Sequence, residues 1–180
     1  MFVVHPSHRG AYQTLFRDRR VSKSYEAIAR DDPRLELPRT VRSRIVKHRG
    51  VICAVEEPGP PNAETRVELL ERRGGLARFR LTPSTGRTHQ LRLHMSGLGV
   101  PILGDDFYPE LWDRPLDDFR RPLQLLAATL EFTDPVDGTA RRFRSRRTLQ
   151  AWSCLAEWQG GMRGSPASRS GHPNAGENCY

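Results

Sequence analysis

The sequence predicts an α+β domain with a mixed, mainly antiparallel sheet and flanking helices. Two pairs of β-rich runs are each joined by a glycine-containing turn, which is a hairpin pattern. The pairs are residues 65–72 with 76–82 and residues 125–133 with 139–144. Helical spacing of apolar residues occurs in separate segments outside these runs. Hairpins together with separate helices are typical of the α+β class.

The chain is predicted to begin with a helix followed by a strand. Ala11, Leu15 and Phe16 fall at helical spacing within residues 7–19, and Ser7 is the expected N-cap. Alternate residues from Val21 to Ala29 lie on one face of a predicted strand.

The next segments are predicted as strands that a proline-rich loop separates. Residues 39–55 hold one or two strands, with Ile45 and Val51 among the apolar positions. Residues 56–62 are predicted to be a loop, because two adjacent prolines cannot donate hydrogen bonds to a sheet.

The second half is predicted to hold a helix, the second hairpin and a short final helix. Leu91, Met95 and Leu98 recur at helical spacing in residues 88–98, and Gly99 follows as a helix stop. Leu149 to Glu157 forms the final helix. Glycine, serine and proline dominate afterwards, so we expect one domain over residues 1–158 and a disordered tail over 159–180.

The chain is basic and rich in arginine. Its 180 residues carry a formal net charge of +8 with pI ≈ 10.2, and all but two of the 29 basic residues are arginine. Residues 1–50 hold twelve cations against five anions, and a second cluster lies at residues 141–147. This distribution favours nucleic-acid binding. A solvated basic face or an arginine-rich codon bias remains the alternative.

Composition excludes several other classes of protein. No apolar run approaches the length of a transmembrane helix, and the N-terminus does not resemble a secretory signal. Three scattered cysteines without a CxxC pair predict neither a disulfide framework nor a cysteine-based zinc site. We therefore expect a cytoplasmic protein that does not associate with membranes.

Residues 81–108 carry the clearest chemical pattern. A turn through Ser84 and Gly86 delivers polar residues to the start of a predicted helix, where free N–H groups favour an anion. His89, Arg92 and Ser96 share one helix face that can look into a cleft. The alternative is a solvated face with His89 capping the helix. His89 and His94 point in different directions, and no third ligand is evident, so no metal site is predicted.

Several segments resemble RluA-type pseudouridine synthases. The run GRTHQLRLH at residues 86–94 and the later Gly104-Asp105 pair are similar to one motif region of that family. The segment LFRDRRVSKSYEA at residues 15–27 is similar to the family's Lys-x-Tyr region. The resemblance extends over residues 2–155 in the family's order.

This resemblance implies the pseudouridine synthase catalytic-domain fold and isomerisation of uridine in ribosomal or transfer RNA. It implies no cofactor and no metal; we expect a monomer if the full domain is present. Tyr25 matches the family's active-site tyrosine, although a buried sheet tyrosine with a paired hydroxyl is the alternative. Arg92 matches the arginine that pairs with the catalytic aspartate. The remaining basic and polar residues expected to contact RNA are Arg19, Arg20, Lys23, Arg87, Thr88, His89 and Gln90.

The sequence departs from the family at its start. The family's His-Arg-Leu-Asp segment and following Thr-x-Gly turn, which supply the nucleophile, do not occur in the chain. Phe2-Val3-Val4 resembles the strand that follows them. We therefore expect a domain without its N-terminal part, which leaves a sheet edge unpaired, Arg92 without a counter-ion and the chain inactive.

Asp105 is expected to be a turn residue and not the nucleophile. The alternative to an enzyme is a non-catalytic RNA-binding module derived from the same fold.

Overall fold

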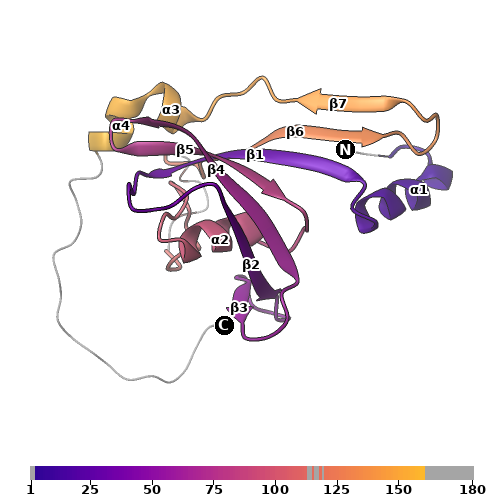
Figure 1. The fold of residues 1–180 in the computed structure, drawn as a ribbon, viewed down its shortest axis with the longest axis horizontal. Coiled ribbons are helices and arrows are strands. Elements are labelled where there is room, and N and C mark those ends of the chain that lie inside the picture. The colour runs from indigo at the N-terminus through magenta and orange to yellow at the C-terminus, as the bar shows by residue number, and fades with distance from the viewer. Residues whose placement is uncertain (1–2, 113–114, 116–117, 119, 161–180) are drawn as a thin grey trace.

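The computed structural model describes residues 3–112, 115, 118 and 120–160. Within these residues, seven strands form one sheet in the order β3-β2-β4-β5-β1-β6-β7. The elements in chain order are α1 (Pro6–Arg17), β1 (Val21–Arg30), β2 (Arg39–Val46), β3 (Val55–Glu57), β4 (Ala63–Arg73), β5 (Leu76–Pro83), α2 (Gln90–Gly97), β6 (Leu125–Thr133), β7 (Ala140–Arg144), α3 (Gln150–Ser153) and α4 (Leu155–Gly160) (Figure 1).

The predicted α+β class with an antiparallel sheet is confirmed. Every pair of neighbouring strands is antiparallel. Both predicted hairpins form, β4 with β5 and β6 with β7. Strand β1 lies between β5 and β6, so the segment with the Lys-x-Tyr pattern is held on both sides by hydrogen bonds. This placement makes β1 the rigid base of any site that its side chains form.

The two faces of the sheet carry separate hydrophobic clusters. On one face, Phe79 and Leu81 of β5 pack against Leu91 and Met95 of α2, all within the larger core cluster. On the opposite face, Ile28 of β1 packs with residues of the C-terminal segment around Trp158. In Figure 1, α2 lies below the sheet and α3 and α4 lie above it. Helix α2, which carries the predicted site residues, therefore packs on one face of the sheet, and the C-terminal helices pack on the other.

Helix α1 begins one residue earlier than predicted and has a different cap. Pro6 occupies the first turn and His5 the N-cap position, with no capping hydrogen bond from its side chain. Proline suits this position because its φ is already helical and its missing N–H would have no partner there. Leu15 secures the helix by packing against Val21 and Phe132.

The prediction of one or two strands in residues 39–55 is confirmed, since the segment contains one complete strand, with Val51 in the loop between β2 and β3. Two other predicted boundaries are wrong. Glu56 and Glu57, predicted as loop, belong to β3, where they pair with residues of β2. The final helix is divided into α3 and α4, and Cys154 between them has a non-helical backbone.

The two ends of the chain also differ from expectation. Val3 and Val4 do not form a strand, and Val4 is exposed. The tail predicted over 159–180 starts too early, because α4 runs to Gly160. Residues 161–180 and Phe2 lie outside the described part of the chain.

Candidate active site

Tyr25 stands at an irregularity in the centre of the sheet. The register between β1 and β6 shifts between Ser24 and Tyr25. The ring is half-buried, and burial raises the pKa of its hydroxyl. Within the described residues, this hydroxyl has no hydrogen-bond partner. The geometry therefore differs from the alternative of a fully buried sheet tyrosine with a paired hydroxyl.

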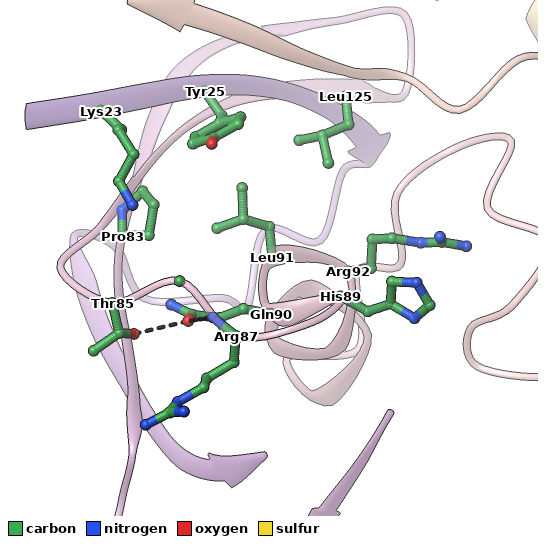
Figure 2. Close-up of a pocket in the computed structure, with 11 residues that line it drawn as sticks. Lys23, Tyr25, Pro83, Thr85, Arg87, His89, Gln90, Leu91, Arg92 and Leu125 are labelled. Atoms are coloured by element: carbon green, nitrogen blue, oxygen red, sulfur yellow. Dashed lines mark hydrogen bonds between the residues drawn. The ribbon is translucent and has the colours of Figure 1, made fainter. Parts of the chain in front are cut away.

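A pocket of about 200 Å³ lies between Tyr25 and the start of α2. Figure 2 shows the Tyr25 ring with the side chains of Leu91 and Leu125 around one space. Lys23 lies two residues before Tyr25 and lines the same pocket, and burial lowers the pKa of its amine. The pocket thus combines an aromatic ring and aliphatic walls with three basic residues, Lys23, Arg87 and Arg92.

A wider groove of about 590 Å³ continues from this pocket toward the end of α1. Lys23, Tyr25 and Arg87 line both spaces. Arg19 lines the groove, and its φ of 57° marks the tight turn that links α1 to β1. None of the described residues that line the pocket or the groove is a carboxylate. The combined cleft is therefore positively charged and open to an anionic ligand.

Helix α2 begins at Gln90, two residues later than predicted. His89 precedes it with a left-handed backbone, φ 55°, and makes no capping hydrogen bond with its side chain. A left-handed residue cannot continue a helix, so the sequence 84–89 forms the loop that enters the pocket. The predicted stop at Gly99, with φ 78°, is confirmed.

Gln90 organises this loop from a buried position. Its Oε1 accepts hydrogen bonds from Thr85 Oγ1 at 2.7 Å and from the Arg87 N–H at 3.0 Å. Its Nε2 donates to the Glu64 carbonyl and to Thr65 Oγ1, both at 2.9 Å. The side chain is 4% exposed. Gln90 therefore ties the turn to β4 and leaves no polar atom for a ligand.

His89 is turned toward the loop after α2. Its Nδ1 and Tyr108 Oη are 2.9 Å apart, and Tyr108 Oη also donates to the Ala54 carbonyl at 2.8 Å. In Figure 2 the imidazole points away from Tyr25. Burial lowers the pKa of His89, and the nearby Arg92 cation lowers it further. His89 thus joins the pocket rim to two loops, and its lowered pKa favours the neutral imidazole.

Arg92 has a carboxylate partner, contrary to the prediction that it would lack a counter-ion. Its Nε donates to Asp105 Oδ2 at 2.9 Å and its Nη2 to Asp105 Oδ1 at 2.5 Å. The side chains are 15% and 1% exposed. The guanidinium also lies over the Phe107 ring, 4.3 Å from its centroid. The prediction was wrong because Arg92 is paired with Asp105, which the sequence analysis assigned only to a turn.

Asp105 also shapes the turn in which it lies. Its Oδ1 accepts hydrogen bonds from the backbone N–H groups of Phe107 and Tyr108, at 2.8 and 3.1 Å. The predicted turn role is therefore observed, and the same carboxylate holds Arg92. The spacing between Arg92 and Asp105 along the chain carries no signal for this pairing, since the two lie on different elements.

The remaining predicted residues lie at different distances from the pocket. Arg87 is exposed, and its Nε donates to the Asn62 carbonyl at 3.2 Å. Thr88 is exposed and does not line the pocket. Arg20 lines a neighbouring groove instead, and its Nη2 lies 3.8 Å from Asp18. Of all the predicted site residues, the structure brings six together around one pocket: Lys23, Tyr25, Arg87, His89, Gln90 and Arg92.

The described residues show neither a metal site nor a membrane span. In this part of the chain, no group of three histidine, cysteine or acidic side chains is placed to hold a metal ion. None of the described helices combines the length and apolar character that crossing a membrane requires. His94, which is fully buried, lies between Ser43 Oγ at 3.0 Å and Thr65 Oγ1 at 2.9 Å.

Comparisons with known proteins identify relatives of this domain. A family model described as RNA pseudouridylate synthase matches residues 7–97. The chain is 35% identical over 135 residues to the dual-specificity RNA pseudouridine synthase RluA of Yersinia pestis, covering 72% of this chain and 62% of that protein. It is 33% identical over 147 residues to ribosomal large subunit pseudouridine synthase C of Salmonella typhi, covering 77% of this chain and 46% of that protein.

The fold has a counterpart among solved structures. The human RNA pseudouridylate synthase domain containing 1 superposes with a TM-score of 0.65 at 24% identity, covering 92% of this chain and 75% of that one. This similarity establishes the fold. The chain spans less than two thirds of the length of these two bacterial relatives. The family match over half of the chain, together with these relatives, places the chain in the RNA pseudouridylate synthase family, of the RluA type.

Proposed function

We propose that this domain binds RNA and holds a uridine in the pocket beside Tyr25, as part of an enzyme that isomerises uridine to pseudouridine. The observation that carries the proposal is the half-buried ring of Tyr25, whose hydroxyl has no described partner, in a cationic pocket that no described carboxylate lines. Both named bacterial relatives are pseudouridine synthases.

The pocket suits a flipped base better than a stacked one. A uridine must leave its stack before its glycosidic bond can be reached, at a cost of a few kcal/mol. An aromatic ring offsets part of this cost by stacking on the base, at about 1–3 kcal/mol per base. Tyr25 supplies the ring, while Leu91 and Leu125 supply apolar walls. The free hydroxyl of Tyr25 is available for proton transfer near the sugar.

The cations around the pocket suit the phosphates on either side of that base. Lys23, Arg19 and Arg87 line the continuous cleft. Arginine donates two parallel hydrogen bonds to a phosphate, and lysine acts as a point charge. Gln90 and His89 act indirectly in this proposal, because their polar groups hold the loops that form the rim.

The reaction itself is a rearrangement within one nucleoside. The bond between N1 of uracil and C1′ of the ribose breaks, and a bond between C5 and C1′ forms. The hydrogen on C5 is lost as N1 gains one, so the atoms balance without a cofactor. The nucleophile implied by the family resemblance is an aspartate, and Arg92 would orient it. Two nitrogens of Arg92 already bind Asp105, whereas Nη1 has no described partner.

The 180-residue chain by itself is proposed to bind RNA without turnover, because its cleft has no described carboxylate. A non-catalytic RNA-binding module is the second candidate function, and the same observation favours it. The two candidate functions make different predictions for a protein that also has an aspartate close to Tyr25 and Arg92. Only the enzyme should then form pseudouridine.

The test compares this chain with a version preceded by a His-Arg-Leu-Asp segment and a Thr-x-Gly turn. Each protein is incubated with unmodified transfer RNA and large-subunit ribosomal RNA, and the digested nucleosides are separated by chromatography. We expect pseudouridine only with the aspartate-bearing version. Turnover by the 180-residue chain would contradict the assigned need for that aspartate. RNA binding by both versions without turnover would favour the binding module.

A further inference from the structure

A second basic groove lies on the face of the sheet opposite Tyr25. It has a volume of about 580 Å³ and is lined by Glu26, Leu126, Arg78 and the arginines around the end of β7. Consecutive residues of a strand point to opposite faces. Tyr25 lines the cleft and Glu26 the second groove, and Leu125 and Leu126 divide in the same way. The two spaces are therefore separated by the thickness of the sheet.

Three of the four arginines that line this groove have no carboxylate partner among the described residues. Arg144, Arg146 and Arg147 are exposed, and none has a carboxylate within ion-pair distance among the described residues. Their neighbours Arg141 and Arg142 on the same strand are paired, with Asp134 and Asp137 and with Glu131. The arginines at the start of β7 are therefore neutralised by carboxylates, whereas those at its end and just after it, which line the groove, are not.

The side chain of Arg78 is held in place more firmly than the exposed arginines of the groove. Its Nη2 lies 3.3 Å from Glu71 and its Nη1 4.0 Å from Glu26, so the nearby carboxylates are already engaged. The guanidinium carbon lies 5.3 Å from the centroid of the Trp152 ring. Its Nε is buried without a hydrogen-bond partner within the described structure. A ligand oxygen in the groove could accept a hydrogen bond from Arg78 Nε only if the Arg78 side chain shifts. The exposed side chains of Arg146 and Arg147 can reach such a ligand directly.

We propose that this groove binds RNA backbone phosphates and is a second RNA contact, separate from the cleft that holds the target base. The inference rests on the proposed function, because the ligand of the groove is taken to be the same RNA that the cleft is proposed to bind. Arginine is suited to this ligand because its planar fork matches two phosphate oxygens.

A route lined by arginines, of which Arg141 and Arg142 are ion-paired, connects the two faces around the edge of the sheet. Arg19 lines both the cleft groove and a third groove of about 570 Å³. Arg141 and Arg142 at the start of β7 also line this third groove. Arg142 and Arg144 are alternate residues of β7, so they point to the same face. Because β7 is the outermost of the described strands on its side of the sheet, an RNA can pass around it from one face to the other.

This route predicts a dependence on RNA size. A short single strand fits the cleft alone, whereas a folded RNA can reach both faces at once. Removing the cations of the second groove should therefore weaken binding of a folded RNA and leave binding of a short strand unchanged.

The experiment uses the full chain and the double variant Arg146→Ala/Arg147→Ala. Both side chains are exposed and make no described ion pair, so the fold should be retained; a thermal melt checks this. The matched control is Arg34→Ala/Arg120→Ala, which removes two exposed arginines that pair with Asp32 and Asp118. Affinity is measured by fluorescence anisotropy for a transfer RNA transcript and for a ten-nucleotide single strand. The salt concentration is varied between about 50 and 200 mM, a range in which the release of counterions changes the affinity measurably.

We expect the groove variant to bind the transfer RNA about tenfold more weakly at low salt, with a salt slope reduced by about 1.5, because two phosphate contacts are lost. The control should match the wild type for both RNAs. Equal affinities of the groove variant and the control for the transfer RNA would overturn the inference. Equal weakening for both RNAs would also overturn it.

Two further outcomes distinguish a failure of the groove from a failure of the proposed function. A wild-type chain that binds neither RNA would refute the proposed function itself. Vesicles containing phosphatidylserine provide the comparison with a lipid surface. If the groove variant loses vesicle binding but keeps its affinity for transfer RNA, the groove is a membrane contact and the inference is wrong.

Discussion

Arg92 and Asp105 form a buried ion pair in which Nε and Nη2 of the guanidinium each donate to one carboxylate oxygen. The pair joins α2, which lines the pocket, to the turn before Tyr108. The same turn reaches His89 and the backbone of Ala54 through the Tyr108 hydroxyl. The orientation of Arg92 therefore depends on the loop that contains Asp105, which follows α2 in the sequence.

Asp105→Asn should destabilise the protein by about 3 kcal/mol, because it leaves the Arg92 cation without its carboxylate in a site where Arg92 is 15% exposed. Urea unfolding measures the change. Glu131→Gln is the control, since its partner Arg142 is 73% exposed. That substitution should cost less than about 1 kcal/mol. Equal losses for the two variants would show that burial does not set the strength of the Arg92 pair.

Gly104→Ala should also destabilise this turn, by a route that involves no charge. Gly104 has φ +72°, and a Cβ built there would collide with the backbone carbonyl of Pro122. We expect a loss of about 1–3 kcal/mol from backbone strain. Gly97→Ala is the matched control, because a Cβ on Gly97 in α2 meets no atom within 4 Å. It should stabilise by up to about 1 kcal/mol. Thermal melts of both variants distinguish these opposite shifts.

Stability should fall as the pH falls through about 6.5, the ordinary pKa of histidine. Burial lowers the pKa of His94 in the folded state, so the unfolded chain takes up a proton that the folded chain does not. The stabilising contribution is complete above about 6.5 and is lost below it. His94→Gln should reduce the difference in unfolding free energy between about pH 7.5 and 5.5. An unchanged difference would mean that other groups control this transition.

Tyr25→Phe should abolish pseudouridine formation by the aspartate-bearing version while leaving RNA affinity within about twofold, because the ring and its stacking surface remain. Chromatography of nucleosides and anisotropy measure the two effects. Since the Tyr25 hydroxyl has no described partner, its removal should not lower the melting temperature. Full turnover by Tyr25→Phe would exclude the hydroxyl from the chemistry.

Elements with strong local patterns could be predicted from the sequence. The strand predicted over 125–133 has those bounds in the structure, because a β-rich run ends at Asp134-Pro135. The hairpin at Gly74-Gly75 forms because both glycines take positive φ values, 59° and 75°. In contrast, the predicted start of α2 is wrong, since His89 has a left-handed backbone and its ring contacts Tyr108, which is distant in the sequence.

The site was predictable where residues are close in the sequence. Lys23 and Tyr25 alternate on one strand, so their common position in the pocket follows from strand geometry. The burial of Gln90 and the pairing of Arg92 with Asp105 depend on how α2 packs against β4 and the later turn. Such through-space contacts leave no periodic signal, and for that reason the counter-ion of Arg92 was predicted wrongly.

The most direct test of the proposed base pocket is to locate where a uridine contacts this chain. Transfer RNA containing 4-thiouridine is irradiated with the 180-residue protein, and the cross-linked peptides are identified by mass spectrometry. We predict cross-links in the peptides that contain Tyr25 and residues 83–87, and their loss with unlabelled RNA as competitor. Cross-links confined to segments that do not line the pocket would contradict the assignment of this pocket to the target base.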